Sequence, residues 1–539
     1  MGQEINFESI SALEKEIDEG RGDTIKLKRT RNSMLNISVL VPSEILGHIF
    51  NLLVVSSRRY SAGPHTVTPM NPGNGFGGLE SGWYNFLLVC HHWLEVAYGT
   101  PELWTFWGTS LDDWEKRSIR AGSAPVDLVL FEDRYHDPTD PPQILSIPLQ
   151  NNLLGRTAQD TVREIHIDSG NFELVTAIVS FLTPNGEGTR ERCIESIILR
   201  TGWEEPLDLS NFFARSRLPK LQRLHFEGCI DASVGTHLTS QTTRLTSLDL
   251  DWRPPSLSKS QLLSILLSNP NLRELSLTST VLPFDMDESE IRVPLRRLET
   301  MILTGKSDYV FSLLRLLELP AALNYTELNF DEAPVVEDIS RTLGPYMQNC
   351  LRHDIRFQEK LSITFLNSFI DVRPFSEETS EETERTPRFL IYASSRPYPD
   401  IFSNLIAFVS CERVVHLDMS HSLGVEELFI AMPNIERLDL HEVSLTDEFL
   451  QPDQDGPHAN AKLLPSLQYL NLEDVVADAG WKPLVDYLVH QTSNRQAISL
   501  RLQAGPGTSG VPLEVIREVE GLVEELEISE FRWASDDDD

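Results

Sequence analysis

Few residues in this sequence have types and spacing that could do chemistry, and the adjacent histidines His91 and His92 are the first to consider. Adjacent positions on a helix point about 100° apart, so these two side chains cannot easily share one metal ion or one substrate. The sequence has no GxSxG, HExxH, Gly-Lys-Ser/Thr or paired-cysteine signature. With 81 acidic residues in the chain, no carboxylate pair stands out. We therefore expect a chain without catalytic activity of its own.

A glycine-rich segment and five cysteines give no sign of a cofactor site. The segment 71–78, NPGNGFGG, resembles a phosphate-binding loop only superficially, because no Gly-Lys-Ser/Thr follows it. The cysteines have neither metal-ligand spacing nor a readable disulfide framework. They are Cys90, Cys193, Cys229, Cys350 and Cys411. We expect no metal and no cofactor, and a reducing compartment, cytoplasmic or nuclear, is the default.

The net charge of −35, from 81 acidic against 46 basic residues, argues against general nucleic-acid binding. Such binding needs cations that displace counterions from phosphate. The charge is equally unsuited to anionic membranes, and the sequence has no run of about 18 apolar residues that could span one. The first twenty residues are acidic where a secretory signal would start basic. The acidity either keeps the protein soluble or favours a basic protein partner.

Two helices and a short turn are expected between residues 41 and 104. In VPSEILGHIFNLL (41–53), Pro42 suits a first helical position, and the apolar residues that follow recur on one broad face. The segment 54–82 is rich in Ser, Gly, Pro and Asn and predicts a loop. A second helix is expected from Tyr84 in YNFLLVCHHWLEVA (84–97). Thr100 and Pro101 then suit the cap and first position of a short third helix.

Internal repetition dominates past residue 150. The pattern Φ-x-x-Φ-x-Φ, where Φ is apolar, starts at residues 162, 194, 221, 245, 272, 298, 325, 414, 435, 467 and 523. Between 194 and 325 successive starts are 27, 24, 27, 26 and 27 residues apart. The alternating apolar positions predict short strands with one buried face. Helices are expected between strands, as at 258–272 and 484–491, so the pattern predicts a strand–helix solenoid.

Prolines punctuate these repeats. A proline bars the preceding helix from continuing into the strand, and it occurs in a Leu-Pro, Asn-Pro or Met-Pro pair before several strands. These pairs are Leu218-Pro219, Asn269-Pro270, Met432-Pro433 and Leu464-Pro465. Between about 331 and 410 the register blurs.

These features divide the chain into five segments. A helix and a basic linker are expected in 1–36, a helical module with the loop 54–82 in 37–107, and a transition in 108–150. The strand–helix array takes 151–530, with an acidic loop at 376–386, and an acidic tail takes 531–539.

The helical module resembles the F-box. Three elements carry the resemblance in order: Pro42-x-Glu44-Ile45-Leu46 with Ile49 and Phe50, then Val89-Cys90-x-x-Trp93, then Thr100-Pro101-x-Leu103-Trp104. The pattern is closest to the large fungal F-box group that carries degenerate leucine-rich repeats. Two departures are Val41, where leucine is usual, and the long loop between the first two helices.

The resemblance implies an α+β chain: a small all-α F-box module followed by an α/β leucine-rich-repeat solenoid of horseshoe-like form. In the family, the module binds a Skp-type adaptor, which joins it to a cullin–RING ubiquitin ligase. The implied adaptor-contact residues are Pro42, Ile45, Leu46, Ile49, Phe50, Val89, Cys90, Trp93, Leu103 and Trp104. Some of them must instead form the core of the module, and so small a module cannot bury all of this surface by itself.

The repeats would contribute a recognition surface for a protein substrate. In each strand the positions between the apolar residues point outward, and a stacked array aligns them. The candidate substrate-binding residues are Arg223, His225, Asp249, Glu274, Glu327, Asp439, His441 and Tyr469. The predominance of carboxylates on these outward positions is consistent with a basic partner.

Three hypotheses follow. The first is a substrate receptor of a Skp–cullin–F-box ligase, and the second is a non-catalytic leucine-rich-repeat scaffold whose F-box-like helices do not engage the ubiquitin machinery. The third is an enzyme whose site carries no recognisable signature. Binding to a purified adaptor separates the first two, whereas hydrolase or transferase activity of the isolated chain would support the third.

Overall fold

The computed structural model divides the 539-residue chain into two compact units, Met1–Leu245 and Thr246–Asp539. Apart from isolated positions, the described residues are 41–59, 91–107, 114–131, 161–170, 172–183, 189–201, 206–229, 233–241, 244–253, 257–279, 292–320, 323–332, 361–366, 369–374, 388–393, 411–420, 432–441, 464–475, 480–493, 498–504 and 511–529.

Several expected segments lie outside the described residues. They are nearly all of the N-terminal segment 1–36, the second expected helix as far as Cys90, most of the loop 54–82, the acidic loop 376–386 and the tail 531–539.

The first unit begins with helices. They are α4 (Ser43–Arg59), α6 (His91–Tyr98), the 3-10 helix η2 (Pro101–Trp104) and α7 (Trp114–Ala121). The loop expected from residue 54 begins later, because α4 continues to Arg59. The sequence has no glycine or proline between Gly47 and Gly63, so nothing in it breaks the helix at residue 54.

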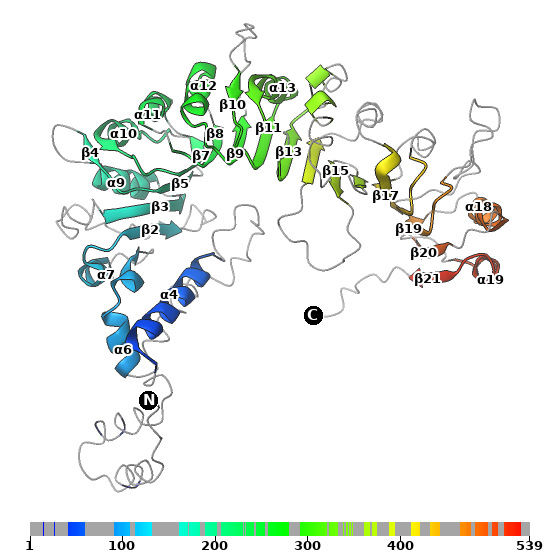
Figure 1. The fold of residues 1–539 in the computed structure, drawn as a ribbon, viewed down its shortest axis with the longest axis horizontal. Helices are drawn as coiled ribbons and strands as arrows, with labels where there is room; N and C mark the ends of the chain where they lie inside the picture. The colour runs from blue at the N-terminus through cyan, green and yellow to red at the C-terminus, as the bar shows by residue number, and fades with distance from the viewer. Residues whose placement is uncertain are drawn as a thin grey trace, which may run out of the picture. The chain divides into compact units, whose positions relative to one another are not determined.

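Among the described residues of the first unit, a series of five parallel strands pairs in chain order. They are β1 (Phe106–Trp107), β2 (Val126–Phe131), β3 (Val162–Ser169), β5 (Ser196–Thr201) and β7 (Arg223–Cys229). The short strands β4 (Arg190–Glu191) and β6 (Ser216–Arg217) also pair. The helices are α9 (Phe172–Leu182), α10 (Ser210–Arg215) and α11 (Ser233–Gln241), and α10 and α11 lie on the same side of β5 and β7 (Figure 1).

The second unit contains a longer series of strands. Along the sheet they are β8 (Ser247–Arg253), β9 (Glu274–Ser279), β11 (Thr300–Gly305), β13 (Tyr325–Phe330), β16 (Arg388–Ala393), β15 (Phe369–Pro374), β14 (Leu361–Leu366), β17 (Val414–Ser420), β18 (Arg437–His441), β19 (Tyr469–Val475), β20 (Ser499–Ala504) and β21 (Glu525–Ser529). All these pairings are parallel except the two made by β15.

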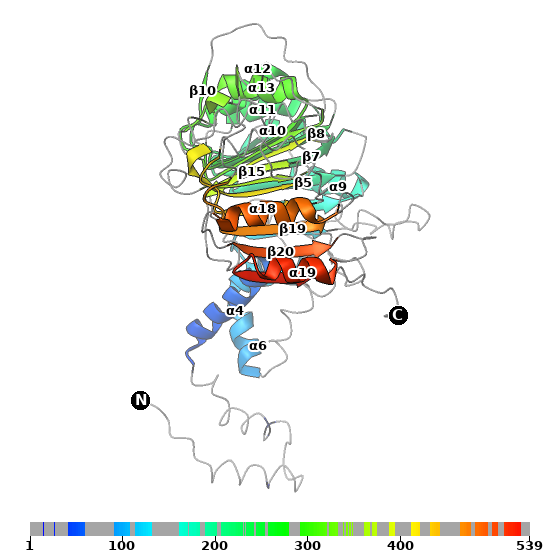
Figure 2. The same ribbon diagram turned by 90° about the vertical axis from the view of Figure 1, so that its right-hand side faces the viewer.

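The helices of the second unit follow individual strands. They are α12 (Lys259–Ser268), α13 (Ser307–Leu316), α18 (Lys482–Ser493) and α19 (Leu513–Glu520), with the 3-10 turn η7 (Cys411–Arg413) and the strand pair β10 (Val293–Pro294) and β12 (Leu317–Glu318). Helices α12 and α13 lie on one side of β8 to β13 (Figure 1), and α18 and α19 lie on one side of β19 to β21 (Figure 2). The chain is therefore mixed α and β with predominantly parallel strands.

A recurring turn positions the start of many strands. In five repeats a buried apolar residue donates its N–H group to the carbonyl three residues earlier, at 3.1 to 3.4 Å. The donors are Leu221, Leu272, Leu298, Ile435 and Leu467. In four of these turns the second residue is proline, whose fixed φ suits that position of a type I turn. The predicted Leu-Pro, Asn-Pro and Met-Pro turns are confirmed at all four sites.

A shared carbonyl then fixes the register of neighbouring strands. Arg273 and Glu274 both donate N–H groups to the carbonyl of Thr246, at 2.8 and 3.0 Å. The same double donation reaches the carbonyls of Glu195, Arg273, Glu299 and Glu436 from the strands that follow them. At these five places the later strand thus begins at the same height as its predecessor, and equivalent side chains stand in rows.

Each of the eleven predicted strand segments overlaps a strand. Their alternating apolar residues are buried except Tyr325, Val523, Leu526 and Ile528, which are partly buried. The repeat pattern did not identify β14, β15, β16 or β20 as strands. The segment 108–150, expected as a transition, contains α7 and β2. Strand β2 pairs with β3, so the parallel strands begin before residue 151.

Gly228 in β7 gives a test of this close strand packing. Its φ is +118°, and a Cβ atom there would collide with the hydroxyl oxygen of Thr201 and lie 2.5 Å from the Thr201 carbonyl oxygen. We expect Gly228→Ala to lower the free energy of unfolding by about 3 kcal/mol through strain and steric overlap. Gly122→Ala is the matched control, because Gly122 also has positive φ but open space around it. Equal losses in urea denaturation would contradict this account.

Candidate functional site

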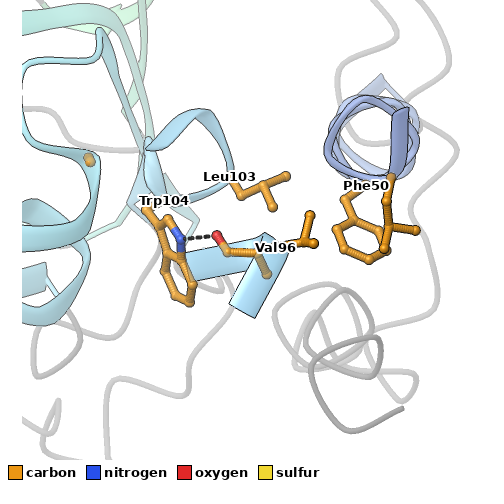
Figure 3. Packing of buried hydrophobic residues seen from close by; sticks show 7 residues of the cluster. Phe50, Val96, Leu103 and Trp104 are labelled. Atoms are coloured by element: carbon orange, nitrogen blue, oxygen red, sulfur yellow. Dashed lines mark hydrogen bonds between the residues drawn. The ribbon is translucent and has the colours of Figure 1, made fainter. Parts of the chain in front are cut away.

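A small apolar core holds the helical module together. It consists of Leu46, Phe50, Val96, Ala97, Leu103, Trp104 and Ala121, with Val41 and Trp93 packed against it (Figure 3). The rings of Phe50 and Trp93 lie 5.0 Å apart between centroids, which joins α4 to α6. These apolar residues come from both parts of the predicted motif, and their packing holds the helices of the module together.

Polar contacts fix the turn between α6 and η2. The Trp104 indole N–H donates to the carbonyl of Ala97 at 2.8 Å. Thr100 occupies the predicted cap position, but its hydroxyl donates to the Val96 carbonyl at 2.7 Å and does not cap η2. A Cβ atom on Gly47 would lie 2.9 Å from the Thr100 hydroxyl oxygen, so the glycine permits α4 to approach this turn closely.

The face of α4 that points away from this core is also apolar. Ile45, Ile49, Leu52 and Leu53 are 53, 42, 56 and 52% exposed, and we call these four residues the α4 surface. Their spacing of i, i+4, i+7 and i+8 places them on one stripe of the helix. Large aliphatic side chains gathered in one exposed stripe make this face a candidate protein-binding surface.

The predicted adaptor-contact residues thus divide into groups. Leu46, Phe50, Leu103 and Trp104 are buried in the core of the module, and Trp93 is partly buried against it. Pro42, Ile45 and Ile49 are exposed. Val89 and Cys90 lie outside the described residues. Leu52 and Leu53 were absent from the predicted set, although their helical spacing from Ile45 could have revealed them.

Helix α7 connects this module to the strands of the same unit. The Arg120 guanidinium lies 4.3 Å from the Tyr98 ring centroid and 4.2 Å from that of Trp104. In β2, the Asp127 carboxylate accepts two hydrogen bonds from Arg163, at 3.0 and 2.8 Å. The Arg120 contacts join α7 to α6 and η2, and the Arg163 contacts join β2 to β3.

On the outward strand face of the first unit, charged groups pair with one another. Arg200 donates to the ring of His225 at 3.1 Å and lies 3.6 Å from Glu227 and 3.9 Å from Asp168. Burial, reinforced by Arg200 and His225, lowers the pKa of the neighbouring His166 to about 3. His166 is therefore neutral at physiological pH. Of the two predicted residues here, His225 belongs to this cluster and Arg223 is exposed.

On the second unit, Asp439 is the centre of a larger network. It accepts hydrogen bonds from Arg437 at 2.7 and 3.1 Å and from the Asn471 amide at 3.0 Å, and it bonds to His416 at 2.6 Å. Burial alone would raise the pKa of Asp439, but the hydrogen bonds from His416 and Arg437 outweigh it and hold this pKa well below its usual range. The Arg437 guanidinium also lies 4.6 Å from the Tyr469 ring centroid.

His441 links three strands in the same region. Its Nε2 atom bonds to Asp418 of β17 and its Nδ1 atom to Glu473 of β19, both at 2.8 Å. The hydrogen bond with Asp418 is the largest cause that raises the pKa of His441 to about 9. At neutral pH this imidazolium therefore lies between two carboxylates.

The remaining predicted residues lie on the earlier strands of the second unit. Glu327 accepts hydrogen bonds from the Tyr325 hydroxyl at 2.5 Å and from the Asn329 amide at 2.9 Å. Asp249 is partly buried and Glu274 is exposed. The structure thus brings Asp439 and Tyr469 together through Arg437, with His441 close by. Arg223 and His225 share β7, and Asp249, Glu274 and Glu327 lie on three other strands.

In this network, carboxylates that the sequence analysis assigned to a basic partner are paired within the chain. Asp418, Asp439 and Glu473 already pair with Arg437 and His441 of the same chain, so this region offers little uncompensated negative charge to a basic partner. His416 and Asp418 were not among the predicted residues. They occupy the outward positions of the segment VVHLDM, so the alternation that located its buried residues could have located them too.

Ser362, His416 and Asp439 form a hydroxyl–imidazole–carboxylate series, with 2.9 Å from the serine oxygen to Nδ1 and 2.6 Å from Nε2 to the carboxylate. Such a series resembles a nucleophilic triad. Ser362 is only 2% exposed, however, and its hydroxyl cannot meet a substrate. The series therefore crosslinks β14, β17 and β18. No cluster of three metal-binding side chains occurs among the described residues.

Comparison of the sequence with protein-family models found no match, and comparison with curated proteins found none either. Within the described residues, no helix has the length and apolar character needed to cross a membrane.

The His441 bridge predicts a pH dependence of stability. Its pKa is about 9 in the folded protein and near 6.5 when unfolded, so its stabilising effect is complete below pH 6.5 and is lost as the pH rises through 9. We expect the stability difference between the wild type and His441→Asn to shrink by about 2 kcal/mol across that interval, measured by urea denaturation. Asp418→Asn should remove most of this pH dependence. A difference that stays constant from pH 6 to pH 9.5 would contradict the assignment.

Proposed function

We propose that this chain is the substrate-recognition subunit of a Skp–cullin–F-box type ubiquitin ligase. Its helical module would dock a Skp-type adaptor, and its strand array, which we interpret as degenerate leucine-rich repeats, would bind a protein substrate. The chain would act in the cytoplasm or the nucleus.

The α4 surface is the observation that supports this proposal best. Leu46 and Phe50 face the core of the module, whereas Ile45, Ile49 and Leu52 are exposed and are not part of that core. A helix with two apolar faces, one of which lies in solvent, is suited to pack against a helix of a partner. The exposed face lies within the segment that carries the F-box resemblance.

The chain itself would not catalyse ubiquitin transfer. Ubiquitin transfer would belong to the assembled ligase, in which this subunit raises the effective concentration of substrate near the catalytic subunits. Binding of this kind requires a docking surface and a recognition surface. It requires no nucleophile, metal or cofactor in this chain.

The adaptor interaction can be tested with a variant that spares the core. We expect full-length Ile45→Asp with Ile49→Asp to bind a purified Skp-type adaptor at least about a hundredfold more weakly than wild type, by isothermal titration calorimetry. Each substitution removes apolar area from the interface and buries a charge there. The thermal midpoint should be almost unchanged, because both side chains are exposed.

Ile119→Asp is the matched control for this experiment. Ile119 lies on α7, is 75% exposed and has no part in the α4 surface, so its replacement should leave adaptor binding intact. If the wild-type chain does not bind the adaptor, or if the double variant binds like wild type, the proposal is wrong. The scaffold alternative would then stand.

A further inference from the structure

Strand β21 ends the parallel series of the second unit. Strands β17 to β20 each pair on both sides, whereas among the described residues β21 pairs with β20 alone. The first residues of β19 and β20, Tyr469 and Ser499, donate their N–H groups to the strand before them, at 3.0 and 2.8 Å. Alternate residues of a parallel strand bond to opposite neighbours, so the second and fourth residues face the following strand. In β21 these positions are Leu526 and Ile528.

The apolar core is left open at the same place. Leu500 and Leu502 in β20 are fully buried, whereas their register partners Leu526 and Ile528 are only partly buried. Leu513, which begins α19, is 71% exposed. An added strand would satisfy the outer backbone groups of β21 and cover these side chains, as a β-augmenting peptide does.

The negative charge around this edge favours a positively charged binding segment. Residues 513–529 carry six exposed carboxylates and one exposed base, Arg517, while Arg501 of β20 lies 3.7 Å from Glu527. The carboxylates are Glu514, Glu518, Glu520, Glu524, Glu525 and Glu527. Two copies of this edge would bring like charges together, which disfavours self-pairing. A segment with lysine or arginine between apolar residues would complement both features.

We propose that β21 is a docking edge for an extended, basic segment of a partner protein, which adds to the sheet as a further strand. This edge differs from the β17–β19 region, where the carboxylates are already paired with His441 and Arg437. The inference does not rest on adaptor binding by α4. The proposal places the basic partner expected from the acidic sequence at β21, the last strand of the second unit.

Fluorescence anisotropy with the full-length chain tests this proposal. The probe is a fluorescein-labelled peptide of alternating lysine and valine. We expect saturable binding that weakens at least about tenfold when Glu525→Lys is combined with Glu527→Lys. The same peptide with an N-methyl group on every residue should fail to bind the wild-type chain, because neither of its edges can donate N–H groups to the backbone ladder. The comparison of the two peptides uses only the wild-type chain, so it does not depend on whether a variant folds.

The control variant combines Asp308→Lys with Glu332→Lys, which makes the same charge change at two exposed positions of the same unit. It should bind the peptide within about twofold of wild type. Ile45→Asp with Ile49→Asp should also bind it normally, so failure of adaptor docking and failure of this edge are distinguishable. Four results would overturn the proposal. They are binding of the methylated peptide as tight as that of the unmethylated one, the same loss of affinity in the control variant, no binding by the wild-type chain, and a wild-type dimer that Glu525→Lys dissociates.

Discussion

The shared carbonyl that receives two N–H groups at the start of successive strands is the constraint on which the strand array depends. At the five places where it occurs, it sets a strand level with its predecessor, so the apolar residues of both repeats enter the core at the same height. The outward side chains are aligned by the same register. Part of the Asp439 network follows from this alignment, because Asp439 and Asn471, 32 positions apart in sequence, meet across neighbouring strands.

The alignment also determines where charge is compensated. Between β17 and β19, Asp418 and Glu473 pair with His441 on an adjacent strand, whereas Asp439 pairs with Arg437 of its own strand and bonds to His416 of β17. The hydrogen bonds that cross between strands hold those strands together. At β21 the series stops, and no described strand supplies further partners. The charged groups of β17 to β19 are therefore largely paired within the chain, whereas β21 combines partly buried leucine and isoleucine with an excess of exposed carboxylates.

In the helical module, different residues of α4 form the core and the exposed surface. Its core is small, so α4 commits Leu46 and Phe50 to folding and leaves Ile45 and Ile49 exposed. Adjacent residues of one motif thus have separate roles. Contacts from Arg120 to Tyr98 and Trp104 then join the module to α7, which leads into the first strands.

Much of the fold could be predicted from the sequence because its signals are periodic. The Φ-x-x-Φ-x-Φ segments identified eleven strands, and the proline turns marked the starts of several. Strands β14 to β16 were missed because β15 runs antiparallel and interrupts the repeat. The site was less accessible: periodicity shows that Ile45 and Leu46 share an apolar face, but only packing decides which one reaches the core. Likewise, Asp439 was chosen as an outward carboxylate, while its pairing with Arg437 and His416 depends on a register that the sequence does not specify.

The central claim is that α4 carries an adaptor-docking surface separate from its folding core. Hydrogen–deuterium exchange of the full-length chain, with and without a purified Skp-type adaptor, tests it most directly. The account predicts slower exchange in Ser43–Arg59 on adaptor addition and no change in Glu525–Ser529. Unchanged exchange in α4 under conditions that saturate an intact interaction, or protection confined to the strands, would contradict it.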